Sequence, residues 1–341
     1  MKILIKNILA LVLTLSFYQK ISANAAQPGI WNAGGTVFTM MFPEDSATFK
    51  KVQMQQEKIY MQLYPGFAVV KGWYKMRNTS KEKLKFKMGY PINGIYSGGR
   101  SDLNQVHLDS LTQFKIFSNR IELPLIKTKI DDDRVEKIQS FGDNWLVWEM
   151  DFLPEETKIV EVYFLVETND GKIRKGYNLD SYNAFIYLLE SGSVWKQPIE
   201  KGEFFVQLMQ GLTEKDIRGM SSGFQFLWNK QLNMAKGFKT NFSPTEADNL
   251  IITYSERNEK FNFSSIVLEK EKWYKFIDEF SENTPKINFN EKLKDKDPYE
   301  VSESMLSYLP LAIMALVLII PAIIVLFLLF FLIKKFRKKI K

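Results

Sequence analysis

The chain has 341 residues, of which 45% are hydrophobic and 25% charged, so its composition is that of a folded protein and excludes disordered and low-complexity classes. It contains no cysteine, which excludes disulfides, thiolate metal sites and cysteine nucleophiles. A single histidine, His107, excludes any multi-histidine metal cluster and leaves one imidazole base.

The net charge of +7 belongs to the two ends of the chain. Nine of the 46 basic residues lie in residues 1–25 and 334–341, where there is no acid, and the other 37 face all 39 acidic residues. The body therefore has no basic excess of the kind that nucleic-acid binding needs. We predict no nucleic-acid partner.

Residues 1–25 are typical of a secretory signal peptide. Lys2 and Lys6 precede a short apolar run from Ile8 to Phe17, and Ala23-Asn24-Ala25 offers the small residues that signal peptidase tolerates. We expect cleavage after this segment, and an uncleaved N-terminal anchor is the alternative.

The body, residues 26–265, has the pattern of a β protein. Between residues 56 and 166, apolar and polar side chains alternate in runs of strand length, separated by turn signals such as Pro65-Gly66. In the first run, Ile59, Met61 and Leu63 share one face. This pattern predicts a mainly β fold of antiparallel β-sandwich domains, one over residues 26–170 and a second β-rich domain over residues 171–265.

An amphipathic helix and a polar stalk are expected over residues 266–303. Trp273, Phe276, Ile277 and Phe280 recur at helical spacing within a charged background. Two interpretations remain open for this membrane-proximal helix. It packs on the second sheet, or it acts as a lever or partner-binding helix.

The C-terminal segment is predicted to be a transmembrane helix over residues 305–333. Leu309 to Ile333 is a run of 25 residues without a charged or hydrogen-bonding side chain, and a helix of that length spans roughly 37 Å, enough to cross a bilayer core. Pro321 should kink this helix. The basic tail 334–341 follows, and the positive-inside rule places it in the cytoplasm. We therefore expect a single-pass membrane protein whose N-terminal ectodomain lies outside the cytoplasm.

No catalytic set is visible in the sequence. A triad built on His107 with Asp102 or Asp109 lacks a nucleophile elbow, and there is no P-loop or dinucleotide fingerprint. The metal candidate is the acidic triplet, whose carboxylates are oxygen ligands suited to Ca²⁺: Asp131, Asp132 and Asp133. Because no glycine or later glutamate completes a calcium loop, a solvated turn is the alternative.

Tryptophans are the candidates for a recognition surface. Trp145 and Trp148 are three residues apart, so on one strand they point to opposite faces. An outward-facing tryptophan can anchor a protein partner or stack on a sugar ring. We therefore single out Trp73, Trp145 and Trp195 as a recognition surface, with burial between sheets or domains as the alternative.

Four motifs in the body, in this order and spacing, resemble the bacterial exported family called domain of unknown function 4424. They are Gly34 to Phe38, Trp73 to Thr79 followed by Gly89-Tyr90-Pro91, Tyr187 to Ile199, and Phe242 to Ile252. The resemblance implies export and a β-rich architecture but no reaction, and it implies a bacterial cell membrane as the location. The first half is also similar to the N-terminal β-sandwich domains of inter-α-trypsin-inhibitor-like proteins.

The sequence thus predicts a membrane-anchored binding or assembly protein of the cell envelope. It would act by recognising a protein or ligand, with an envelope protein as the expected partner and no catalytic residue or cofactor apart from the Ca²⁺ candidate. Two alternatives stay open. One is an envelope hydrolase whose carboxylate pair is assembled by folding, and the other is a sensor ectodomain that signals to a membrane partner through the Pro321 kink.

Overall fold

The computed structural model describes the body of the chain over residues 29–37, 40–41, 46–97, 104–108, 111–129, 138–140, 142–175, 178–293 and 296–299, and the C-terminal region at residues 313, 315–317, 319, 323 and 325–333. The predicted signal peptide 1–25, the acidic triplet Asp131–Asp133 and the basic tail 334–341 lie outside the described residues. Residues 28–174 and 179–300 form one compact unit, and the remaining residues belong to a second.

The mainly β fold is confirmed, and the described strands form three sheets. Sheet A has the order β11 (Ile138–Ser140), β6 (Gly94–Ser97), β7 (Asn104–His107), β1 (Gly29–Val37), β14 (Gly171–Lys175), β15 (Asn178–Leu188), β20 (Leu250–Glu256), β17 (Ile217–Ser221). Sheet B has the order β10 (Ile126–Thr128), β12 (Trp145–Phe152), β5 (Leu84–Pro91), β2 (Met40–Met41).

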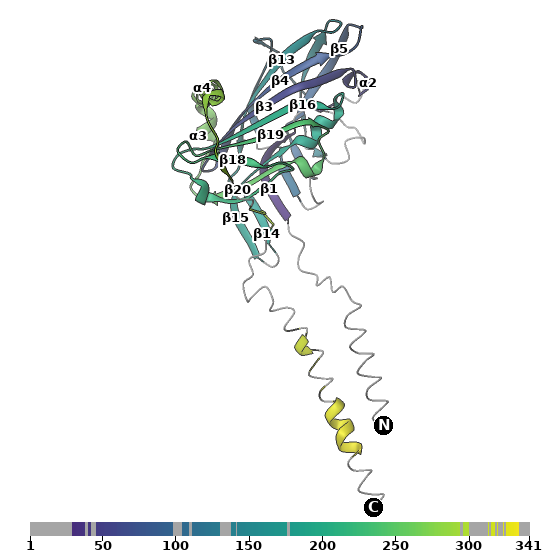
Figure 1. Cartoon of the computed structure of the whole chain (residues 1–341), viewed down its shortest axis with the longest axis vertical. Coiled ribbons are helices and arrows are strands. Elements are labelled where there is room, and N and C mark those ends of the chain that lie inside the picture. The colour runs from purple at the N-terminus through teal and green to yellow at the C-terminus, as the bar shows by residue number, and fades with distance from the viewer. Residues whose placement is uncertain are drawn as a thin grey trace, which may run out of the picture. The chain divides into compact units, whose positions relative to one another are not determined.

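Sheet C has the most strands of the three. Its order is β21 (Glu291–Lys292), β18 (Phe226–Asn229), β19 (Met234–Phe242), β16 (Ile199–Leu208), β3 (Val52–Tyr64), β4 (Phe67–Asn78), β13 (Thr157–Glu167), β8 (Leu111–Ser118), β9 (Ile121–Glu122). The helices are short: α2 (Ser46–Phe49), α3 (Phe263–Leu268) and α4 (Lys270–Asn283), with 3₁₀ turns at η2 (Leu189–Val194), η3 (Glu214–Asp216), η4 (Glu246–Asp248) and η5 (Thr284–Lys286). Helices α3 and α4 lie on one side of the long strands of sheet C (Figure 1).

The β3–β4 hairpin follows directly from the sequence. Its turn uses Gly66 at a φ of +104°, a conformation that glycine adopts without a steric penalty. The alternation on β3 is confirmed, since Ile59, Met61 and Leu63 all point into the main core. The opposite face of the same hairpin is buried too, around Tyr60, because α4 packs over it.

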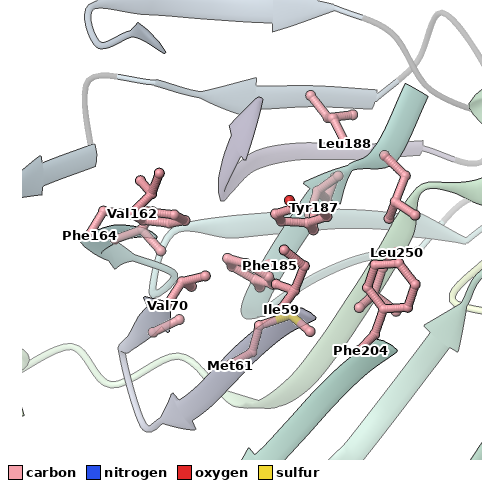
Figure 2. Close-up of a cluster of buried hydrophobic side chains, with 14 of the residues drawn as sticks. Ile59, Met61, Val70, Val162, Phe164, Phe185, Tyr187, Leu188, Phe204 and Leu250 are labelled. Carbon is pink, nitrogen blue, oxygen red and sulfur yellow. The ribbon is translucent and has the colours of Figure 1, made fainter. Parts of the chain in front are cut away.

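The main core lies between the inner face of sheet C and the other sheets. Figure 2 shows this arrangement, in which side chains of β3, β4, β13 and β16 meet side chains of β15 and β20. The labelled members are Ile59, Met61, Val70, Val162, Phe164, Phe185, Tyr187, Leu188, Phe204 and Leu250. A two-layer sandwich results, as expected for sheets with one apolar face each.

The two expected β-rich regions, 26–170 and 171–265, do not build separate sheets. Strand β16 pairs with β3 in sheet C, and β14 and β15 pair with β1 in sheet A. The boundary expected at residue 170 therefore lies inside one compact unit. Most neighbouring strands are antiparallel, as expected, but β3–β16, β1–β15 and β1–β7 are parallel pairs.

The C-terminal region is described only in part. Residues 325–333 are helical, and their large apolar side chains are exposed. Among the residues that the structure describes, no helix is long and apolar enough to cross a membrane. Much of the predicted span over 305–333 lies outside those residues, so the transmembrane helix stays a prediction.

Candidate functional site

The outer face of sheet C, which points away from the main core, is divided into two halves. Helix α4 covers the half that carries Tyr60, Tyr64 and Phe67. Its Trp273 ring meets the rings of Tyr64 and Phe67 edge-on, with centroids 5.1 Å apart in each case. The predicted amphipathic helix therefore packs on a sheet, and its apolar side is used for that contact.

A polar cluster fastens the middle of α4 to the sheet. The ammonium of Lys71 on β4 donates to Asp278 Oδ1 at 2.8 Å and lies 3.3 Å from Glu161 Oε1 on β13. It also donates to Ser281 Oγ at 3.2 Å, and the Tyr163 hydroxyl donates to the same Asp278 oxygen at 2.8 Å. Asp278 thus receives two hydrogen bonds from the sheet, which fix the helix against it.

Replacing Lys71 with methionine should lower the free energy of unfolding by about 2 kcal/mol. The Lys71 side chain is 10% exposed, and its removal leaves two carboxylates without their cation, although the partial exposure of Asp278 reduces the cost. Urea denaturation of the full-length protein measures the change. Lys275→Met on the same helix, where the lysine is exposed, is the matched control and should change stability by less than about 0.5 kcal/mol. Equal effects of the two changes would contradict the role of the cluster.

The other half of the outer face is open and carries Trp73. Strand register places six side chains side by side at one level across six strands, in the order Phe238, Glu203, Lys58, Trp73, Glu161 and Phe117. Because side chains on one level of a sheet face the same way, this row forms a flat surface beyond the end of α4. Trp73 is half-buried, and Phe238 is 53% exposed. The Lys58 ammonium lies 5.2 Å from the centre of the Trp73 ring.

The carboxylates of this row are held by neighbouring cations. Glu203 pairs with Lys201 and Lys236, each at 2.9 Å, and Gln56 donates to it at 3.3 Å. Partial burial works to raise the pKa of Glu203, but the hydrogen bonds from the two lysines outweigh it and keep the pKa below its usual value. Glu203 is therefore a fixed anion of this surface.

Two hollows lie beside α4. The first, of about 480 Å³, lies between α4 and strands β3, β16 and β19, and its lining includes Met209, Met234 and Phe280. It also includes Gln62, which donates to Gln207 at 2.9 Å. The second hollow, of about 260 Å³, lies between α4 and strands β8 and β13. Both hollows flank the helix-covered half, and Phe117 at the end of the row also lines the second one.

Of the three tryptophans singled out from the sequence, only Trp73 is partly exposed. Trp145 is 1% exposed and Trp195 is fully buried, with its ring edge-on to Phe49 at 5.1 Å. The strand register confirms that Trp145 and Trp148 point to opposite faces of β12, since Trp148 pairs with Met88 of the core and Trp145 with Pro91. Both rings are buried nonetheless, so the recognition hypothesis is corrected for Trp145 and Trp195 and retained for Trp73.

The described residues do not form a metal site or a catalytic group around His107. Within the described ranges, no group of three histidine, aspartate or glutamate side chains could hold a metal ion. The Ca²⁺ candidate, Asp131 to Asp133, lies outside those ranges. His107 is half-buried on β7, between β1 and β6 in sheet A, and Asp102 and Asp109 also lie outside the described residues.

A buried carboxyl, Glu57, is the feature that the sequence analysis missed. It lies on the core side of β3, opposite Tyr74 of β4, and its Oε1 atom has no hydrogen-bond partner among the described residues. The Tyr74 hydroxyl is 2.9 Å from the Tyr187 hydroxyl and also hydrogen-bonds Tyr90, so side chains of all three sheets meet there. Desolvation raises the pKa of Glu57 to about 8. Glu57 has the same parity as Ile59, Met61 and Leu63, and this alternation could have identified it.

Comparison with known proteins gives only distant likenesses. No family model and no curated protein matches the sequence. Among solved structures, the chain is similar to a "putative nutrient binding protein" from Legionella pneumophila, at 14% identity and a TM-score of 0.46, over 66% of this chain and 72% of that one. It is also similar to yeast LTA4 hydrolase, native and in complex with bestatin, at 5% and 6% identity and TM-scores of 0.33 and 0.34. The chain spans 29% of the length of that hydrolase.

Proposed function

We propose that this protein is a non-catalytic recognition protein of the bacterial cell envelope, anchored to the cell membrane by its C-terminal apolar segment and related to the exported family of unknown function 4424. The signal-like residues 1–25, the apolar run from Leu309 to Ile333 and the basic tail support this location. An anchor of this kind restricts the β-sandwich body to the membrane plane and raises its effective concentration for neighbouring proteins.

The observation that carries the proposal is the row around Trp73. A tryptophan on a sheet is held by its strand, so little conformational entropy is lost when a partner covers it, and tryptophan is among the residues that dominate binding energy. Phe238 adds a second exposed aromatic to the same flat face. This combination fits a protein partner that packs on the open half of the outer face of sheet C.

The absence of native cysteine makes a direct test possible. A single cysteine introduced as Thr240→Cys, at an exposed position of β19 beside Lys201, carries a membrane-impermeant maleimide–benzophenone label. In cells with an intact cytoplasmic membrane, we expect labelling and a photo-crosslinked complex. Adding Trp73→Ala should weaken the complex about thirtyfold or more, because an anchoring tryptophan contributes about 2 kcal/mol or more.

The matched control is Leu179→Ala, which removes an exposed apolar side chain from β15 of sheet A. It should leave the yield of the crosslinked complex unchanged. Failure of the label to react in intact cells would contradict the location. Equal crosslinking with and without Trp73 would contradict the recognition surface.

A further inference from the structure

The cations around Trp73 are not balanced by the carboxylates of the same face. Lys58 lies beside Trp73 in the row, and Lys75 lies two residues further along β4 on the same side of the sheet. The two acids of the row already have partners, since Glu161 lies against Lys71 and Glu203 is held by two other lysines. Across the described part of the chain, Lys58 and Lys75 have no carboxylate within ion-pair distance.

The same column of β4 continues with a third cation. Trp73, Lys75 and Arg77 alternate along the strand, so all three side chains point to the open half of the face, and Arg77 is exposed. Lys58 is held against the Trp73 ring by a cation–π contact, so its ammonium lies close to the position that a partner of Trp73 would occupy. Lys58 and Lys75 thus lie beside Trp73 without a carboxylate partner among the described residues, and Arg77 continues the same column of β4.

We propose that the partner of this face is a protein that presents an acidic surface, whose carboxylates pair with Lys58 and Lys75 around Trp73. This inference rests on the proposed function and adds the chemistry of the partner. Opposite charges across an interface steer the approach of the partner and select it against others. The row also carries the carboxylates of Glu161 and Glu203 beside the cations, and such a mixed surface suits a protein partner better than a uniformly anionic membrane.

The test uses the full-length protein in nanodiscs of neutral phosphatidylcholine and a fluorescein-labelled polyglutamate peptide as the acidic probe. We expect binding at low salt that weakens about tenfold when the ionic strength rises to about 0.2 M, because exposed charges are then screened. The double change Lys58→Gln and Lys75→Gln should lower the affinity about tenfold. The control Lys127→Gln with Lys260→Gln removes two exposed lysines from other surfaces and should leave the affinity unchanged.

Two outcomes would overturn the inference: no binding of the polyglutamate peptide, and equal binding by the two double variants. If vesicles containing phosphatidylglycerol bind in place of the peptide, in a way that depends on Lys58 and Lys75, the face is assigned to an anionic membrane instead. The crosslinking experiment separates this failure from failure of the proposed function. If Trp73→Ala abolishes the crosslinked complex and the Lys58/Lys75 variant retains it, the recognition surface stands and the acidic partner does not.

Discussion

The stability of Glu57→Gln relative to the parent protein should increase by about 3 kcal/mol as the pH rises from 4 to 7. Burial raises the pKa of the Glu57 carboxyl from 4.5 to about 8 in the folded protein. Each pKa unit corresponds to about 1.4 kcal/mol, so a folded state that keeps its proton up to about pH 8 loses roughly this much stability by pH 7.

The sign follows from proton binding. Below pH 4.5 the carboxyl is protonated in both the folded and the unfolded protein, and Glu57 imposes no pH dependence. Between pH 4.5 and about 8 the unfolded chain releases the proton while the folded protein retains it, so the parent becomes less stable as the pH rises. Tyr74 and Tyr187 lie near this carboxyl, and Tyr90 hydrogen-bonds Tyr74. Burial holds the pKa values of all three tyrosines well above 10, so they stay neutral in this range.

Urea denaturation of the full-length parent and of Glu57→Gln, followed by tryptophan fluorescence across this pH range, measures the difference. Taking the change between two pH values cancels the fixed cost of burying an amide in place of a carboxylic acid. Glu122→Gln, an exposed position on β9, is the control and should follow the parent at every pH. A pH profile of Glu57→Gln that runs parallel to that of the parent would show that the buried carboxyl does not titrate as inferred.

Alternation predicted which residues face the core but not which strands are neighbours. The period of two is a local property, so β3, β4 and β13 were found from their own residues. The parallel pairing of β16 with β3 joins residues that are far apart in the sequence, such as Phe204 and Ile59, and no local signal encodes it. The expected boundary at residue 170 failed to separate two sheets for the same reason.

The tryptophans show a second limit of sequence reasoning. Spacing correctly placed Trp145 and Trp148 on opposite faces of β12. Spacing cannot tell whether an outward face is covered by another part of the chain, and Trp145 is buried while Glu149, four residues further along on the same face, is exposed. Trp73 keeps part of its surface because its level of sheet C lies beyond the end of α4. The proposed recognition by Trp73 therefore depends on where helix α4 ends.

Truncation of Trp273, the tryptophan that packs α4 on sheet C, tests how this helix is held. Trp273→Ala should lower the free energy of unfolding by about 3–5 kcal/mol, the usual range when a buried aromatic side chain is truncated to alanine. The Trp273 ring fills the space between α4, Tyr64 and Phe67, and its indole nitrogen donates to the Ile266 carbonyl at 3.1 Å. Loss of the ring leaves a cavity under α4 and removes the hydrogen bond that joins α4 to α3.

Hydrogen exchange of the full-length protein should show which elements Trp273→Ala destabilises and by how much. We expect faster exchange in α4 and the β3–β4 hairpin of Trp273→Ala, because the helix that covers this half of the sheet is loosened, whereas sheet A should retain its protection. Phe276→Ala, an exposed aromatic on the same helix, should cost less than about 1 kcal/mol. If the two variants are equally stable, the helix is not held by Trp273. If Trp273→Ala loses exchange protection in all three sheets at once, α4 does not open separately from the sandwich. The helix-covered half of sheet C then unfolds together with the rest of the body.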